Sequence, residues 1–283
     1  MPHLPLPLPY PFEFGFMQRA LVAGVVVGVF APMIGTFLVQ KRLSLVGDGI
    51  GHVAFAGVGA GLLLGVWPVW AALAFAVAGA IGVDRLRARR KASGDLALAL
   101  FFYSGIALGV VFVSLGKGLS ANILTYLFGQ PLTVTDREIV VIVLLGAGIV
   151  AVMSGLRRVL FAIVTDEEWA RVAGLPVDPL NSLLAALTAC AVVAAMRIVG
   201  ILLIAAMMVL PVASAQLLAR SFRGTIRWAV VVGTGSVVLG LSSSRIWGLA
   251  PGGAIVLVAA LWFAVVAIAR RAAPRALRQE EHA

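Results

Sequence analysis

Charged residues are scarce in this chain. Asp, Glu, Lys and Arg make up 12% of its 283 residues, about half of the roughly 25% that is typical of soluble domains. Hydrophobic residues make up 61%, and the mean hydropathy is +1.07. A soluble protein of this length needs more polar surface, so the composition excludes a cytosolic enzyme, a disordered chain and a fibrous protein. It indicates a polytopic membrane protein.

Cysteine and aromatic residues are also few. A single cysteine, Cys190, excludes a disulfide framework and a Cys-based metal site. Aromatic residues make up 8% of the chain, and its apolar runs are continuous rather than alternating. Both features argue against an outer-membrane barrel with aromatic girdles. We therefore predict an all-α fold.

Several catalytic and nucleotide-binding motifs are missing. The one Gly-Lys pair, Gly116-Lys117, is followed by Gly118 and lacks the first glycine of a P-loop. The chain also has no H-E-x-x-H segment and no G-x-S-x-G segment with a partner histidine. We predict that the chain is not an enzyme, binds no ATP through a P-loop and holds no permanent cofactor.

Apolar runs of about 20 residues, long enough to cross a bilayer as helices, recur along the chain. We predict nine, at residues 16–39, 44–65, 67–84, 95–115, 138–156, 180–196, 199–219, 228–241 and 252–269. Arg197 alone separates two of them, so a count of eight is also compatible with the sequence. Residues 16–270 form one predicted transmembrane domain. Residues 1–15 are a predicted extended Pro-rich arm, and residues 271–283 a tail.

Lys and Arg are distributed unevenly between the two ends of these runs. If the N-terminus lies outside and nine spans alternate, seventeen of the 22 basic residues fall in inner segments and five in outer ones. Cytoplasmic loops are enriched in Lys and Arg. This bias predicts an outer N-terminus, and a cytoplasmic C-terminus and 157–179 segment. It also accounts for the net charge of +10 without a nucleic-acid partner.

Two ionisable side chains interrupt the second apolar run. Asp48 and His52 are four residues apart, so on a helix they share one face. A carboxylate within a membrane span is costly and usually functional. Because carboxylate and imidazole groups bind zinc or manganese, we predict a metal site, with further ligands from water, backbone carbonyls or a second copy of the chain. The alternatives are a structural Asp–His pair, or Asp48 paired with Lys41 or Arg42.

The polar stretch 157–179 contains a short predicted helix. Thr165 is a candidate N-cap, Gly174 is expected to end the helix, and Pro176 prevents its continuation. The first turn holds three acids that the helix dipole favours, namely Asp166, Glu167 and Glu168. The other segments predicted to be cytoplasmic are basic, so three acids here indicate a surface on which a partner docks. The alternative is a simple surface helix.

Other features concern the helices themselves. Pro211 lies inside a span, where it kinks the helix, either as a static kink or as a hinge. Several glycines are four residues apart, which allows close backbone approach between helices. These pairs are Gly24 with Gly28, Gly57 with Gly61, Gly61 with Gly65, and Gly105 with Gly109.

Four stretches of the sequence resemble permease subunits of zinc and manganese ABC importers. The first is similar to the family segment GSFLVxRRLSLxGDxxxHA, the second to YLFG…T, the third to the cytoplasmic coupling segment and the fourth to VGxLLxxxxLxxPAAxA. The first stretch comprises Gly35–Val39 with Lys41–Ser44, Gly47, Asp48 and His52, and the second comprises Tyr126–Gly129 with Thr133–Asp136. The third comprises Asp166–Glu168 with Ala170 and Gly174, and the fourth comprises Val199–Leu203 with Leu210–Ala215. Three positions depart from the pattern without touching the predicted ligands: Val53, Ala56 and Val212.

This resemblance implies an all-helical permease that works as a homodimer in the plasma membrane of a bacterium. Its expected partners are a cytosolic ATP-binding subunit and an extracellular metal-binding solute-binding protein, besides membrane lipid. Asp48 and His52 would line the path of a transported divalent metal. The ATPase-coupling segment would comprise Asp166, Glu167, Glu168, Ala170 and Gly174.

Two other functions compete with metal-ion import. A permease for metal chelates such as siderophores or haem would share the helical plan, but the sequence shows no wide site for an organic ligand. A membrane-embedded enzyme belongs to a different class, and a hydrolase is hard to build from one histidine outside the termini. We therefore expect zinc or manganese import.

Overall fold

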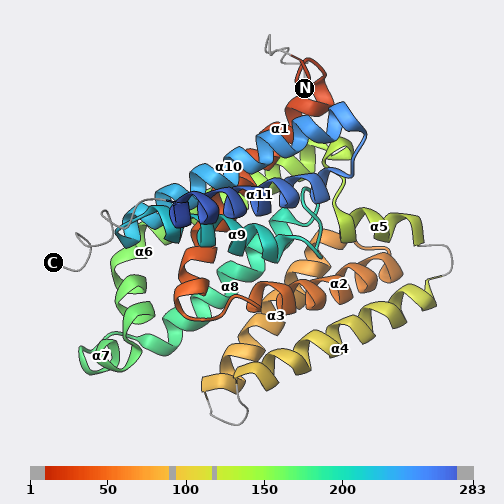
Figure 1. Cartoon of the computed structure of the whole chain (residues 1–283). Helices are drawn as coiled ribbons and strands as arrows, with labels where there is room; N and C mark the ends of the chain where they lie inside the picture. Colours follow the sequence, from red (N-terminus) through yellow and green to blue (C-terminus); the bar gives the residue numbers. More distant parts are fainter. Residues whose placement is uncertain (1–9, 89–93, 117–119, 273–283) are drawn as a thin grey trace.

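The chain folds as a bundle of α-helices (Figure 1). The computed structural model describes residues 10–88, 94–116 and 120–272, and within these it contains no strand. The helices are α1 (Gly15–Gln40), α2 (Val46–Leu64), α3 (Pro68–Ala88), α4 (Gly94–Leu115), α5 (Ser120–Phe128), α6 (Asp136–Thr165), α7 (Glu167–Val172), α8 (Val177–Ala195), α9 (Ile204–Leu218), α10 (Phe222–Trp247) and α11 (Pro251–Ala272), with a 3-10 turn η1 (Pro131–Thr133). The all-α prediction is confirmed. Most of the predicted arm and tail lies outside the described residues.

Eight of these helices are long and apolar enough to cross a membrane, and they are α1, α2, α3, α4, α6, α8, α10 and α11. The predicted span 199–219 is shorter than expected, because helix α9 begins at Ile204 and has 15 residues. At 1.5 Å per residue it is about 22 Å long, less than the roughly 30 Å of a hydrocarbon core. The count of eight full-length spans is therefore the one that the helix lengths support, with α9 as an additional short helix.

Two spans are longer than the apolar runs that predicted them. Helix α6 has 30 residues and α10 has 26, because helical hydrogen bonding continues past the arginines that end each apolar run. The short helix α5 lies between the runs 95–115 and 138–156, where the sequence analysis predicted no span. The remaining spans begin and end within a few residues of their predicted positions.

Helix α8 lies between two groups of helices (Figure 1). On one side α2 packs against α3 and α4. On the other side α1 packs against α6, α9 and α10, and α10 packs against α11. Helices α1 and α2 are the most buried spans and α4 is the least buried. The turn between α1 and α2 therefore crosses from one group to the other and places the start of α2 near the middle of the bundle.

Glycines allow these helices to approach closely. A Cβ atom at Gly28 would lie 2.9 Å from the Thr234 Cα, and a Cβ atom at Gly233 would lie 2.7 Å from the Gly28 carbonyl oxygen. The backbones of α1 and α10 are thus in contact where they cross. Of the predicted glycine pairs, Gly57, Gly61 and Gly105 also face the backbone of a neighbouring helix, whereas Gly24 and Gly109 face side chains. Gly65 ends α2 with a φ of +67°.

We predict that Gly233→Ala destabilises the protein, because the added methyl group would lie 2.5 Å from Pro32 Cγ. Overpacking of this kind costs about 1–3 kcal/mol. The midpoint of thermal unfolding of the purified protein should fall by several degrees. Gly235→Ala on the same helix is the matched control, since nothing lies within 4 Å of a Cβ atom there. Equal midpoints for the two variants would contradict the close crossing of α1 and α10.

Candidate metal and coupling sites

Asp48 and His52 lie on one face of α2, near its start. The distance from His52 Nε2 to Asp48 Oδ1 is 3.8 Å, which is too long for a direct hydrogen bond. The Asp48 side chain is 33% exposed and the His52 side chain 12%, so the pair is accessible from one side. The imidazole ring packs against the Phe102 ring, with centroids 4.3 Å apart. The two side chains therefore share one face of α2, as their spacing predicts, and the metal site stays a prediction.

Backbone from two other segments lies close to this turn of α2. A Cβ atom at Gly105 of α4 would lie 2.8 Å from the His52 carbonyl carbon. A Cβ atom at Gly51 would lie 3.2 Å from the Ile201 carbonyl oxygen, which belongs to the segment before α9. The glycines therefore let α4 and the 196–203 segment pack directly around the Asp48–His52 pair.

The pair offers part of a metal coordination shell. Among the described residues, no third His, Cys, Asp or Glu joins it to form a candidate metal group. Lys41, one of the two alternative partners of Asp48, turns elsewhere: its Nζ lies 3.2 Å from Glu167 Oε2 and 2.6 Å from Asn181 Oδ1. One carboxylate oxygen and one imidazole nitrogen could hold a divalent cation and leave other coordination positions open, as suits reversible binding.

The segment 196–203 is largely buried backbone outside any helix. The Ile201 N–H donates to the Tyr126 carbonyl oxygen at 3.0 Å, and the Leu202 N–H donates to the Leu127 carbonyl oxygen at 3.2 Å. Irregular backbone at membrane depth is tolerated only where protein surrounds it and satisfies its polar groups. The end of α5 does so here, so the second and fourth family-like stretches lie side by side.

A buried ion pair, which the sequence analysis missed, joins this segment to α6. Arg197 Nε lies 2.8 Å from Glu138 Oε1, and the guanidinium lies 5.0 Å from the centroid of the Tyr126 ring. Burial raises the pKa of Tyr126, and the charge of Arg197 opposes that shift. Glu138 also completes a capping box with Thr135 at the start of α6. The Thr-x-x-Glu spacing was readable in the sequence as a cap, but the pairing with Arg197 had no local signal.

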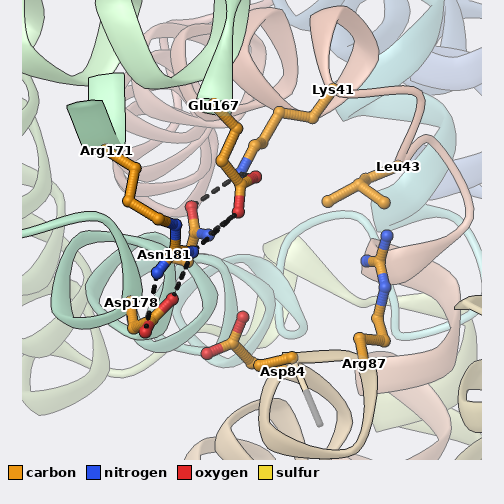
Figure 2. Close-up of a pocket in the computed structure, with 9 residues that line it drawn as sticks. Lys41, Leu43, Asp84, Arg87, Glu167, Arg171, Asp178 and Asn181 are labelled. Carbon is orange, nitrogen blue, oxygen red and sulfur yellow. Dashed lines mark hydrogen bonds and ion pairs between the residues drawn. The ribbon is translucent and has the colours of Figure 1, made fainter. Parts of the chain in front are cut away.

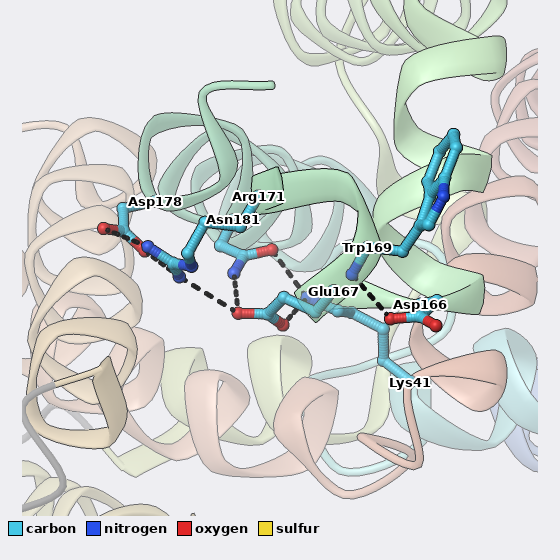
Figure 3. Close-up of polar contacts among 7 residues, drawn as sticks. All are labelled: Lys41, Asp166, Glu167, Trp169, Arg171, Asp178 and Asn181. Atoms are coloured by element: carbon cyan, nitrogen blue, oxygen red, sulfur yellow. Dashed lines mark hydrogen bonds and ion pairs between the residues drawn. The ribbon is translucent and has the colours of Figure 1, made fainter. Parts of the chain in front are cut away.

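The N-cap of α7 is Asp166, whose Oδ1 accepts a hydrogen bond of 2.8 Å from the Trp169 N–H (Figure 3). The predicted cap, Thr165, is wrong. Helix α6 continues unbroken to Thr165, whose hydroxyl donates to the Phe161 carbonyl oxygen at 2.8 Å. The extended residue between the two helices is therefore Asp166, with a φ of −149°.

Gly174 ends α7 as predicted. Its φ is +79°, its N–H donates to the Arg171 carbonyl oxygen at 3.1 Å, and the Leu175 N–H donates to the Ala170 carbonyl oxygen at 3.0 Å. These two bonds form a Schellman motif, which glycine favours because it adopts a left-handed conformation without strain. Ala170 is fully buried in a small cluster with Ile163 and Val177, so it anchors α7 to its neighbours rather than facing outward.

Glu167 binds within the chain. Its carboxylate pairs with Lys41 at the end of α1, and it accepts a hydrogen bond of 3.3 Å from Asn181 Nδ2 of α8 (Figure 3). Arg171 adds an ion pair of 2.9 Å with Asp178. These contacts fix α7 against α1 and α8, so two of the three predicted docking acids, Asp166 and Glu167, shape the corner itself.

The outward face of α7 carries apolar side chains. Trp169 is 61% exposed and Val172 is 89% exposed, and Figure 3 shows the Trp169 ring pointing away from Glu167 and Asn181. The sequence analysis did not single out either residue. On a helix, residues one and two positions from Ala170 point away from the face that Ala170 occupies. Once that face is known to be buried, helical periodicity predicts that Trp169 and Val172 point outward.

A polar groove of about 600 Å³ adjoins α7 (Figure 2). It brings together the end of α1, the end of α3, α7 and the start of α8. Its lining residues are Lys41, Leu43, Asp84, Arg87, Ala88, Glu167, Arg171, Asp178 and Asn181. The groove shows that the 157–179 segment and the turn before Asp48 share one end of the bundle.

Pro211 is buried within α9, which continues through it from Ile204 to Leu218. Because proline has no N–H, the Met207 carbonyl lacks its helical partner. Gly35 of α1 packs against the Met208 carbonyl nearby. A hinge at Pro211 stays a prediction.

The geometry can be set beside known proteins. A family model described as "ABC 3 transport family" matches residues 13–270. The chain is 31% identical to the manganese transport system membrane protein MntC of Listeria innocua, over 88% of this chain and 89% of the relative. It is 29% identical to the high-affinity zinc uptake system membrane protein ZnuB of Haemophilus influenzae, over 86% and 94%.

A solved structure is similar as well. A chain of PsaBC from Streptococcus pneumoniae, in complex with Fab, superposes with a TM-score of 0.82 at 32% identity, over 90% of this chain and 91% of that one.

We predict that Glu138→Gln destabilises the protein strongly, because it leaves the buried Arg197 charge without its partner. Breaking a buried pair in this way costs about 3–5 kcal/mol. Asp136→Asn is the matched control, since Asp136 pairs with Arg19 at 3.3 Å but both side chains are about half exposed. Thermal unfolding of the purified variants measures the difference. A Glu138→Gln variant as stable as the control would show that the pair is solvated.

Proposed function

This chain belongs to the ABC 3 transport family, and we propose that it is the permease subunit that moves manganese or zinc into a bacterial cell. Relatives named as manganese and zinc transport membrane proteins support this substrate class. They favour the bare metal ion over a metal chelate or an enzymatic reaction. As a transport permease the chain is not itself an ATPase, so the energy comes from a separate ATP-binding subunit.

The Asp48–His52 pair is the observation that supports a metal path through this chain. Transfer of a divalent ion out of water requires ligands that replace its hydration shell, and carboxylate and imidazole groups suit manganese and zinc. Two side chains cannot complete a shell, so water, backbone carbonyls or the same pair from a second copy would supply the rest. An incomplete shell lets the ion leave again, and a homodimer with the path near its axis would use both copies.

The α7 end of the bundle is proposed to be cytoplasmic. Most of the basic residues of the chain belong to segments at this end if nine crossings alternate, with the short helix α9 counted as one of them. This topology has the N-terminus outside and the C-terminus inside. The exposed Trp169 and Val172 would then meet the ATPase subunit. The α5 end would face the extracellular solute-binding protein that delivers the metal.

Movement at α7 can reach the metal pair through few contacts. Glu167 holds Lys41, and the turn that follows Lys41 leads into α2 and Asp48 within seven residues. A shift of α7 on ATP binding would therefore displace the start of α2. Pro211 in the neighbouring α9, which packs on both α1 and α2, is the proposed place where the helix bends in response.

We predict that Asp48→Asn and His52→Ala each reduce metal uptake per folded molecule at least about tenfold, because a barrier raised by only 1.4 kcal/mol has that effect. Uptake of manganese and zinc by cells, divided by the amount of folded protein in the membrane, measures this rate. Asp136→Asn provides the control for loss of a carboxylate elsewhere. If uptake falls only in proportion to protein abundance, the pair is structural and the proposed path is wrong.

We predict that Trp169→Ala weakens binding of the ATPase subunit several-fold while leaving the permease folded, because Trp169 is largely exposed. Trp247→Ala is the matched control, with a side chain 71% exposed at the end of α10, which lies at the opposite end of the bundle. Co-purification of the two subunits measures binding. Unchanged recovery of the ATPase subunit with Trp169→Ala would exclude α7 as its docking surface.

A further inference from the structure

A second pocket lies between α6 and α10, away from the Asp48–His52 pair. Its volume is about 380 Å³, and its walls are both basic and apolar. The lining residues are Arg157, Arg158, Phe161, Ser221, Phe222, Arg223 and Ile226. None of them takes part in the contacts that hold α7 in place.

The three arginines of this pocket concentrate positive charge. No acidic residue lines the pocket, and in the part of the chain that the structure describes no ion pair involves Arg157, Arg158 or Arg223. Arg223 also lies in the first turn of α10, where the helix dipole is positive and disfavours a cation. Ser221 caps that turn by accepting a hydrogen bond from the Gly224 N–H. An anion placed among these groups would relieve their mutual repulsion.

The depth of the arginines places them at a bilayer surface. Helix α6 has 18 uncharged residues from Ile139 to Leu156, which span about 27 Å at 1.5 Å per residue, close to the roughly 30 Å of a hydrocarbon core. Arg157 and Arg158 follow directly, where the phosphate groups of lipids lie. Helix α6 continues beyond them to Thr165, so α7 lies farther from the membrane than this pocket.

The apolar wall of the pocket is held in place and partly exposed. The Phe161 and Phe222 rings contact each other with centroids 4.6 Å apart, and Phe222 packs against the buried Phe37 at 5.1 Å. Phe161 is exposed. Phe161 lies one turn beyond Arg157 toward α7, whereas Ile226 lies about one turn deeper in α10 than Arg223, on the side of the hydrocarbon core. Arginines at the headgroup level with an apolar residue on the membrane side match an amphiphile.

We propose that this pocket binds the headgroup of an anionic phospholipid, with its phosphate among the three arginines and an acyl chain along Ile226 toward the hydrocarbon core. Basic pockets between membrane helices bind anionic headgroups in this way. A free phosphate would use the arginines but not the apolar wall. A protein subunit docked on α7 would have to extend past α7 toward the membrane to reach this pocket. The proposal does not depend on which metal is carried.

The test compares Arg157→Gln/Arg223→Gln with Arg85→Gln/Arg87→Gln, which removes the same charge from the end of α3. Each purified protein is reconstituted in nanodiscs of phosphatidylcholine with a minor fraction of phosphatidylglycerol, extracted into detergent, and analysed by native mass spectrometry for bound lipid. We expect the unaltered protein and the α3 variant to retain phosphatidylglycerol over phosphatidylcholine. The pocket variant should retain about tenfold less, because each arginine near anionic lipid contributes several-fold to binding.

Three results would overturn the proposal. The first is equal retention of phosphatidylglycerol by the pocket variant and the α3 variant. The second is displacement of the lipid by millimolar inorganic phosphate, which would mean that the site binds a simple anion. The third is loss of the ATPase subunit from the pocket variant with lipid retention unchanged, which would assign the arginines to a protein interface. Thermal unfolding of each variant establishes that the proteins compared are folded.

Discussion

The arrangement of this bundle depends on satisfying the backbone of residues 196–203, which leave the helical pattern inside a membrane protein. Unpaired N–H and C=O groups at that depth would each cost several kcal/mol, and the end of α5 supplies partners through Tyr126 and Leu127. Gly129 and Gly200 adopt positive φ values and let the two segments touch. The short length of α9, the burial of Arg197 beside Glu138 and the approach of Ile201 to Gly51 all follow from this contact.

The Asp48–His52 pair and α7 are linked by few contacts, although they lie far apart in the sequence. Lys41 holds Glu167 across 126 residues, and α2 begins five residues after Lys41. The same α2 turn is enclosed by Gly105 and Ile201. Helix α7 and the turn of α2 at Asp48 are therefore mechanically coupled. Because packing is tight, a small displacement of α7 must be accommodated by a displacement of the start of α2.

The 157–179 segment shows how one short helix divides its residues between two tasks. Asp166, Glu167 and Ala170 build the corner through a cap, an ion pair and a buried contact. Trp169 and Val172 remain exposed. Acidic composition alone suggested a charged docking surface, whereas the packed helix presents apolar side chains outward. Stable protein interfaces also have apolar contacts at their centres and a polar rim around them.

The sequence by itself determined the fold class, most helix positions, the facing of Asp48 and His52 and the stop at Gly174. These depend on local rules: apolar runs set by bilayer thickness, the 3.6-residue helical period, and the left-handed preference of glycine. Only the tertiary structure decided that α9 is short, that Asp166 rather than Thr165 caps α7, that Arg197 pairs with Glu138, and that Glu167 turns to Lys41. The cap is a local hydrogen bond, but its position depends on how far α6 extends. The other three depend on which distant segment lies alongside, because the polar groups of a buried segment take whichever partners the packing of other helices brings within reach.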